Sequence, residues 1–347
     1  MTAEVVVADS SESTKSTESI VSTASTHQAT LQRLRVALQS KVVGQDGLIE
    51  NLLIALLTDG HVLLEGPPGL AKTRTIHALS DLLEGEFKRA QFTPDLLPSD
   101  ITGTEIFNSQ KGEFQFRPGP LFCNMLLADE INRAPAKVQS ALLEAMGERQ
   151  VTVAGQTYPL PRAFMVMATQ NPLEQEGTYP LPEAQLDRFM LHVRVDYPQH
   201  EQEKLILRLV RNEHTDVVKP KDGISDVLLS EAALLEARRE VMGVFLADSL
   251  EDYLVALVMA TRNIGAYGDD LKNSLTFGAS PRATIALDRA VRAKAWLQGR
   301  DFVTPDDIQE MLPSVLRHRI GLSYIAEANG LDKDQLIAEL IARVAVP

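Results

Sequence analysis

The stretch Gly66-Pro67-Pro68-Gly69-Leu70-Ala71-Lys72-Thr73 decides the fold, because a short apolar run precedes it and a helical pattern follows it. The apolar run His61–Glu65 is expected to be a buried strand, and Lys72–Leu83 a helix. Backbone N–H groups of such a loop, together with the helix N-terminus, offer partial positive charge to phosphate oxygens. Lys72 adds a full charge, and the Thr73 hydroxyl can bind magnesium. The stretch therefore predicts a phosphate loop within an α/β domain.

One position departs from the strict phosphate-loop pattern, which has glycine where Ala71 stands. Alanine is the smallest side chain that could replace it near the phosphates. The alternative interpretation is a Gly-Pro turn that ends a strand, with Lys72 as a solvated helix residue. The flanking strand and helix are the context that the motif requires, and they favour the phosphate loop.

A second apolar strand, Met125–Ala128, ends in two adjacent carboxylates, Asp129 and Glu130. Adjacent residues point to opposite sides of a strand, so the two acids suit different roles. Asp129 would hold magnesium through water, and Glu130 would polarise the water that attacks the γ-phosphate. The alternative is a pair of acids that cap the strand end and the following helix.

Strand and helix patterns alternate through the first two thirds of the chain, which predicts a parallel sheet. Two segments, 101–120 and 151–159, instead have the alternation and turn residues of β-hairpins. The other expected elements are strands at Phe87–Phe92, Ala163–Ala168 and Met190–Val195, a helix from Pro135 to Met146 stopped by Gly147, and a charged helix at Glu201–Val210.

Composition along the chain indicates four segments. Residues 1–30 are rich in Ser and Thr and contain no Leu or aromatic residue, so we expect a disordered tail. An α/β core over 31–216 and a linker over 217–228 follow. Strand signals vanish beyond the linker, which predicts a small all-α domain over 229–347. Its expected helices are Ser230–Val244, Ser249–Arg262, Pro281–Trp296, Pro305–Leu312 and Asp332–Val344.

Overall composition excludes several classes of protein. No apolar run approaches the roughly 18 residues of a membrane helix, and Met1–Val7 lacks the pattern of a signal peptide, so we expect no membrane insertion and a cytoplasmic location. The net charge of -13 opposes sequence-blind binding to nucleic acid. The single cysteine, Cys123, cannot form an internal disulfide or a thiolate metal site, and a core position suits it better.

Taken together, six motifs in this order resemble those of the MoxR-family AAA+ ATPases, which belong to the helix-2-insert clade. The resemblance covers Leu31 to Ile320, nearly all of the expected folded part. It implies a P-loop NTPase core with a parallel sheet, followed by an all-α lid domain. The motifs are Gly44–Asp46, Gly66–Thr73, Leu127–Ala134, Ala168–Pro172, Glu183–Phe189 and Gly278–Ala283.

Three polar residues acquire expected roles from this resemblance. Asn171 matches sensor 1, which orients the attacking water, although an Asn-Pro turn is the simpler interpretation of the residues alone. Arg188 matches the arginine finger that reaches the nucleotide of a neighbouring subunit. Without the resemblance, an arginine beside Asp187 suggests a surface ion pair. Arg282 matches sensor 2, and the sequence leaves open whether it acts within its own subunit.

The resemblance also implies roles around the nucleotide base and along the hairpins. Val42 and Val43 resemble the segment that packs on adenine, with a buried helix end as the alternative. Arg74 completes the expected nucleotide-binding set. The two hairpins resemble the helix-2 insert and the pre-sensor-1 hairpin, which could line a central pore. Their aromatic residues Phe114, Phe116 and Tyr158 suit ordinary hairpin packing equally well.

The function that the resemblance implies is ATP hydrolysis, with ATP and Mg²⁺ bound between subunits of a homo-hexameric ring. The ring would act as a chaperone on a client, often a protein with a von Willebrand factor A domain. A first alternative is a nucleic-acid motor of the MCM type. Such a motor would want basic hairpin tips, whereas Lys111 is the only basic residue near the first tip and none lies near Gly155. A second alternative is a nucleotide-dependent switch with little turnover.

Overall fold

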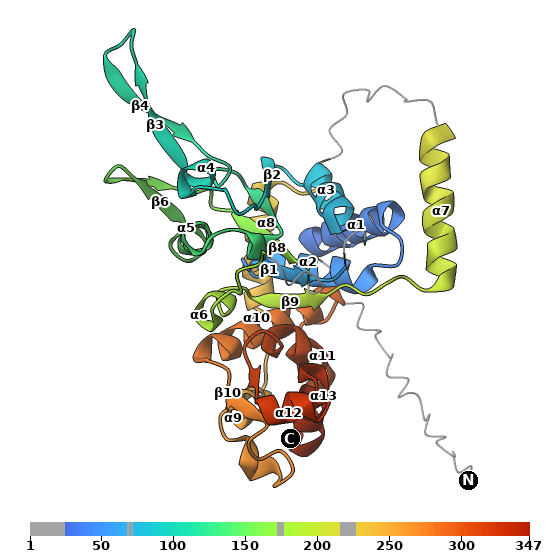
Figure 1. Cartoon of the computed structure of the whole chain (residues 1–347). Coiled ribbons are helices and arrows are strands. Elements are labelled where there is room, and N and C mark those ends of the chain that lie inside the picture. Colours follow the sequence, from blue (N-terminus) through green and yellow to red (C-terminus); the bar gives the residue numbers. More distant parts are fainter. Residues whose placement is uncertain (1–24, 68–69, 71, 172–176, 216–226) are drawn as a thin grey trace, which may run out of the picture.

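A computed structural model describes residues 25–347 except 68–69, 71, 172–176 and 216–226. A five-stranded sheet lies at the centre of its N-terminal part, in the order β2-β5-β8-β1-β9 (Figure 1). All neighbouring strands of this sheet run parallel, as the alternating pattern predicts. The strands are β1 (Val62–Glu65), β2 (Phe87–Gln91), β5 (Met125–Asp129), β8 (Met165–Gln170) and β9 (Leu191–Arg194).

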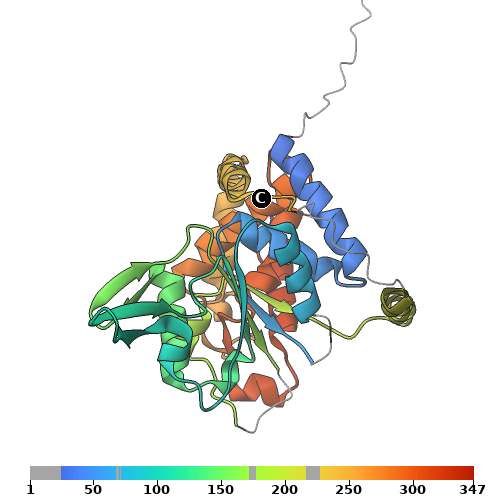
Figure 2. The same ribbon diagram turned by 90° about the horizontal axis from the view of Figure 1, so that it is seen from above.

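Helices cover the sheet on both faces because the strands are apolar on both sides. Leu64 and Leu127 belong to one buried cluster with helices α1, α2 and α3, whereas Leu63 and Leu126 belong to a second cluster with α5. Figure 2 places α1 to α3 and the two hairpins on opposite sides of the sheet. The covering helices are α1 (Thr26–Lys41), α2 (Asp46–Leu57), α3 (Lys72–Leu82) and α5 (Ala136–Glu148).

The first helix begins earlier than expected, so residues 26–30 are helical and are not part of a tail. Ser25 caps the helix by accepting a hydrogen bond from the Gln28 amide, and its own hydroxyl donates to Glu240 at 2.5 Å. Gln28 donates to the backbone carbonyl of Trp296 at 2.5 Å. Contacts with the C-terminal domain therefore stabilise a turn whose own sequence carries few apolar residues. The expected disorder of residues 1–24 lies outside the described residues.

Two hairpins project from the sheet, as predicted (Figure 1). Phe116 of the first stacks on Tyr158 of the second with ring centroids 4.0 Å apart, so these two aromatics pack the hairpins together. Phe107 and Phe114 lie opposite each other in the first hairpin and are 55% and 67% exposed. The strands are β3 (Gly103–Asn108) paired with β4 (Glu113–Pro118), and β6 (Gln150–Val153) paired with β7 (Gln156–Pro159); the short helix α4 (Pro98–Thr102) precedes the first hairpin.

The C-terminal part is helical, as predicted, and its apolar core continues the cluster beneath α1 to α3. It also contains a two-stranded antiparallel pair, β10 (Leu275–Phe277) with β11 (Gly321–Leu322), which is too short to give an alternating pattern in the sequence. The helices are α8 (Glu231–Met242), α9 (Asp248–Ala260), α10 (Pro281–Leu297), α11 (Pro305–Leu316), α12 (Tyr324–Ala328) and α13 (Lys333–Arg343).

Four remaining segments connect these parts. The helix α7 stands apart from the body of the molecule in Figure 1. No helix in the described ranges is both long enough and apolar enough to span a bilayer. The segments are α6 (Glu183–Leu186), α7 (His200–Thr215) and the 3-10 turns η1 (Ile131–Arg133) and η2 (Ile264–Tyr267).

An ion pair joins the two domains at the start of β9. The Arg319 side chain, after α11, is only 2% exposed and contacts the Asp187 carboxylate at 2.8 Å. Arg319 also donates to the backbone carbonyls of Phe189 and Met190. The other Asp187 oxygen accepts a hydrogen bond from Ser280, the N-cap of α10. Asp187 therefore fixes the first turn of α10 against the core.

We expect Asp187→Ala to lower the free energy of unfolding by about 3–5 kcal/mol, since it leaves the buried Arg319 charge without its partner. Thermal unfolding monitored by circular dichroism measures the change. Glu236→Ala is the matched control, because the exposed pair of Glu236 with Arg239 contributes less than about 1 kcal/mol. Equal midpoints for the two variants would show that Asp187 does not stabilise the junction.

Candidate active site

The predicted phosphate loop, acid pair and sensor 1 residue meet at one edge of the sheet. Lys72 begins α3 after β1, Asp129 ends β5, and Asn171 follows β8. Because β1, β5 and β8 run parallel, their carboxyl ends lie at the same edge, where α/β proteins bind ligands. The structure thus brings these residues together from separate parts of the chain. The loop positions Pro68, Gly69 and Ala71 lie outside the described residues.

Lys72 is held at the end of β1. Its Nζ donates a hydrogen bond to the Gly66 carbonyl at 2.6 Å. Burial lowers the pKa of the Lys72 ammonium, and the nearby carboxylates of Asp129, Glu130 and Glu65 partly oppose that shift. The ammonium therefore lies within the electrostatic reach of both acids, as a shared phosphate and metal site requires.

Asp129 is held by contacts to both of its carboxylate oxygens. The Thr169 hydroxyl donates to one oxygen at 2.6 Å, and Arg89 donates to the other at 2.5 Å. The same Thr169 oxygen accepts the backbone N–H of Glu130 at 2.8 Å. Because both oxygens of Asp129 already accept hydrogen bonds, this carboxylate is suited to hold a magnesium ion through water. Thr73, at the start of α3, has a hydroxyl oxygen of the kind that binds magnesium directly.

Glu130 leaves the strand in the left-handed conformation, with φ at 58°. This conformation is uncommon for a residue with a side chain, and it turns the chain into η1 directly after β5. The Glu130 carboxylate accepts a hydrogen bond from Gln91 at 2.8 Å and pairs with Arg133 at 3.2 Å. The two acids therefore have separate partners, in line with the separate roles expected for them.

Sequence reasoning missed the side chains that hold the acid pair, namely Arg89, Gln91 and Thr169. Arg89 and Gln91 lie on β2, where Gln91 is in register with Asp129. Gln91 and Glu130 are 39 residues apart in the sequence. Their proximity therefore becomes visible only when the order of the strands in the sheet is known. Thr169 lies on β8, two residues before Asn171 and within the motif Ala168–Pro172, and this spacing was the available signal.

The residues expected near the nucleotide base lie between α1 and α3. Val42 is buried at the end of α1, whereas Val43 in the following turn is half-exposed. Arg74 donates to the Lys41 carbonyl at 3.1 Å and so ties α3 to the end of α1. Arg74 follows directly on Lys72 and Thr73, and its contact with Lys41 brings the turn that contains Val43 toward the start of α3.

The structure does not bring Arg188 or Arg282 to Lys72. Both line a cavity of about 310 Å³ at the amino-terminal edge of the sheet, beside Gly60 and His61. The four residues of β1 separate this edge from the phosphate loop by about 13 Å. We name it the arginine cavity, after the arginines that line it, which are Arg149, Arg188, Arg282, Arg289 and Arg319.

Arg188 lies across the last turn of α5, where it donates to the Leu143 carbonyl at 2.5 Å. A Cβ atom built on Gly147 would lie 2.2 Å from the Arg188 guanidinium, so glycine makes room for it. Gly147 was expected to stop α5, but the helix continues to Glu148 and ends at Arg149, which has φ at 53°. That expectation was wrong, since α5 continues through Gly147 and the left-handed residue that ends it is Arg149.

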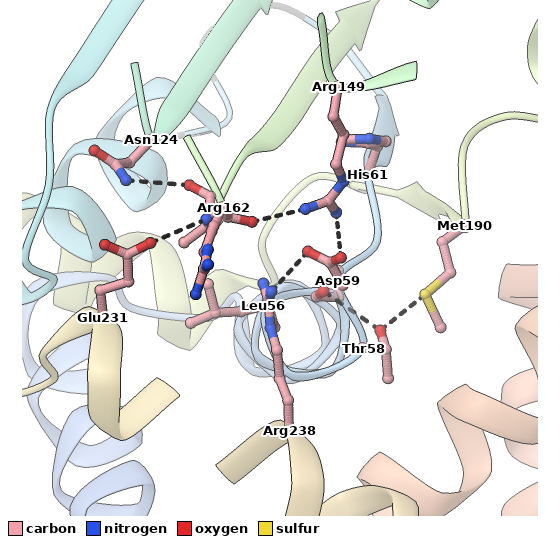
Figure 3. Close-up of polar contacts among 12 residues, drawn as sticks. Leu56, Thr58, Asp59, His61, Asn124, Arg149, Arg162, Met190, Glu231 and Arg238 are labelled. Atoms are coloured by element: carbon pink, nitrogen blue, oxygen red, sulfur yellow. Dashed lines mark hydrogen bonds and ion pairs between the residues drawn. The ribbon is translucent and has the colours of Figure 1, made fainter. Parts of the chain in front are cut away.

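Asp59, His61 and Arg149 line the arginine cavity and belong to a charged cluster that Figure 3 shows. Asp59 lies between Arg149, with which it forms an ion pair, and Arg238 of α8, at 2.7 Å. Beside it, burial lowers the pKa of His61 to about 4, so this imidazole is neutral near pH 7. Asp59 thus neutralises part of the local positive charge and joins α8 to the core.

Comparisons with known proteins show what the chain is similar to. Residues 61–191 match the model of the ATPase family associated with various cellular activities (AAA), and residues 270–340 match the AAA lid domain. The chain is 46% identical over 319 residues to Chaperone MoxR1 of Mycobacterium tuberculosis, covering 92% of this chain and 82% of that protein. It is 33% identical over 326 residues to Protein MoxR of Paracoccus denitrificans, covering 90% and 94%. A crystal structure of a protein from Cytophaga hutchinsonii superposes with a TM-score of 0.84 at 45% identity, covering 92% and 96%.

Proposed function

The chain belongs to the MoxR family of chaperone-like AAA+ ATPases, and we propose that it hydrolyses ATP at the subunit interfaces of a homo-hexameric ring. One observation carries this proposal. The phosphate loop and acid pair lie at one edge of the sheet, while Arg188 and Arg282 lie at the other, so one subunit holds two incomplete halves of a site. A second copy of the chain, placed edge to edge, completes the site.

The first half of the site binds the nucleotide. Gly66, Pro67 and Leu70 belong to the loop whose N–H groups would receive the phosphates, and Lys72 would exchange its contact with the Gly66 carbonyl for a phosphate oxygen. Thr73 and Asp129 would hold Mg²⁺, which when bound neutralises charge on the phosphates. Val43 and Arg74 would lie beside the base and sugar.

Glu130 and Asn171 would position the attacking water. Gln91 and Arg133 both contact Oε2 of Glu130, and the Oε1 oxygen would accept the proton of the attacking water. Asn171 is buried at the end of β8, next to β1, which suits an amide that reads the γ-phosphate. Gln91 of β2 and Arg133 of η1 would thus hold Glu130 in position for this step.

The second half of the site comes from the neighbouring subunit. Arg188 would stabilise charge that develops on the transferred phosphoryl group, as arginine fingers do. Arg282 lines the same cavity. Ser280, two residues before Arg282, donates a hydrogen bond to Asp187, the neighbour of Arg188, and this bond would keep the two arginines in a fixed relative position. Sensor 2 therefore acts, in this proposal, on the nucleotide of the neighbour and not on its own.

Work on a client protein would follow from movement of the hairpins and the lid with each nucleotide state. We assign the core to residues 26–216, beginning with α1, the linker to 217–228 and the lid to 229–347, and we place the activity in the cytoplasm. A protein with a von Willebrand factor A domain is the proposed client. The exposed Phe107 and Phe114 offer apolar surface to a polypeptide, whereas Lys111 is the only basic residue near the tip of the first hairpin that could contact phosphates.

We expect Lys72→Ala to weaken binding of Mg·ATP by about 10- to 100-fold, because the variant loses a charge-assisted contact with phosphate. Isothermal titration calorimetry measures the affinity. Lys204→Ala, on the exposed surface of α7, should bind like the unmodified chain. No Mg·ATP binding by the folded, unmodified chain, or equal affinities for the two variants, would contradict the proposed nucleotide site.

A further inference from the structure

The arginine cavity carries an excess of positive charge. Its five arginines exceed the two aspartates in its wall, Asp59 and Asp187, by three charges. Asp59 pairs with Arg149, and Asp187 pairs with Arg319. Three guanidinium groups are therefore left without a carboxylate among the described residues, and they belong to Arg188, Arg282 and Arg289.

Two of these three groups lie on one face of α10. Arg282 and Arg289 are seven residues apart, which is nearly two helical turns and about 10 Å along the axis. Both side chains are exposed and line the cavity, as does Ile285 between them, which is 53% exposed. The motif that singled out Arg282 ends at Ala283, so Arg289 had no signal in the sequence except its spacing.

These charges would be costly to bury without an anion. Closing an interface over three unpaired guanidinium groups removes water from each of them, and such burial is unfavourable unless negative charge replaces the water. The described wall of the cavity offers no further carboxylate. A second copy of the chain would supply that charge, because its Asp129, Glu130 and bound triphosphate lie at the opposite edge of its sheet.

We propose that Arg289 is a third arginine that contacts the phosphates of ATP bound to the neighbouring subunit, alongside Arg188 and Arg282. This inference rests on the proposed ring and extends it, because it assigns the arginine cavity as a whole to recognition of the neighbour's polyphosphate. The link between Asp187 and the N-terminus of α10 holds the three arginines in a fixed arrangement. Arg289 thereby couples assembly of subunits to the nucleotide that they hold.

The test measures assembly driven by nucleotide. Sedimentation velocity of the full chain, with and without Mg²⁺ and a non-hydrolysable ATP analogue, compares Arg289→Ala and Arg289→Lys with Arg239→Ala. Arg239 is the matched control because it is exposed on α8 and pairs with the exposed Glu236. We expect Arg289→Ala to weaken analogue-driven association by about tenfold and to leave association without the analogue unchanged. Arg289→Lys should lie between, since lysine retains the charge and loses the planar fork.

Three outcomes of these experiments would overturn the inference. The first is an Arg289→Ala chain that assembles like Arg239→Ala. The second is equal weakening with and without the analogue, which would make Arg289 an ordinary interface residue. The third is binding of tripolyphosphate by dilute, monomeric chain that Arg289→Ala abolishes, which would assign the cavity to a free anion. If the unmodified chain bound no analogue and did not assemble, the proposed function itself would fail together with this inference.

Discussion

Replacing Arg188 by alanine is expected to lower the maximal rate of ATP hydrolysis by about 10³- to 10⁵-fold, the range measured for arginine fingers. The reason is its place in the arginine cavity, from which it cannot reach the Lys72 of its own chain. Affinity for ATP, measured on dilute subunits, should stay within about twofold because the phosphate loop is intact. A steady-state phosphate-release assay together with calorimetry measures both quantities.

Two further variants sharpen this result. Arg188→Lys should recover only part of the rate, because an ammonium cannot form the two parallel contacts of a guanidinium. Arg239→Ala removes an exposed arginine from α8 and should hydrolyse ATP like the unmodified chain. A rate for Arg188→Ala close to that of Arg239→Ala would remove Arg188 from the site.

Glu130→Gln is expected to reduce hydrolysis by about 10²- to 10⁴-fold while ATP remains bound, since the amide cannot accept a proton from the attacking water. The substitution preserves the size of the side chain and the hydrogen bond that the backbone N–H of residue 130 donates to the Thr169 hydroxyl. Rapid mixing followed by quantification of bound ADP separates cleavage from product release. Glu144→Gln on the exposed face of α5 is the matched control.

This variant also separates the enzyme from the nucleotide-dependent switch. A switch with little turnover would hydrolyse ATP slowly both with and without Glu130, so the unmodified chain and Glu130→Gln would have similar rates. An ATPase requires a large difference between them. A Glu130→Gln chain held with ATP is also the form with which to capture the client.

The N-terminal domain could be predicted from the sequence because its signals are local. The loop at residues 66–73 stands directly between a strand and a helix, and the acid pair follows directly on an apolar strand. Such patterns depend on neighbours along the chain, so a single sequence contains them. The family resemblance then ordered the elements correctly, and the structure and the comparisons confirm the fold class.

What could not be predicted depends on contacts between distant segments. Thr26–Thr30 is helical because Ser25 and Gln28 contact the lid, more than 200 residues away. Gly147 lies inside α5 against the Arg188 guanidinium, a contact that a local rule for helix ends could not reveal. The contacts of Arg89 and Gln91 with the acids likewise require the strand order. The short β10–β11 pair depends on its partner and not on a periodic pattern.

The central claim is that two subunits share each site, and mixing two inactive variants tests it most directly. Lys72→Ala subunits lack the nucleotide half and keep Arg188, whereas Arg188→Ala subunits have the opposite defect. Random assembly of equal amounts places the two intact halves together at about one interface in four. We therefore expect the mixture to hydrolyse ATP well above the sum of its components. Mixed rings, verified by sedimentation, that hydrolyse no faster than that sum would contradict the shared site.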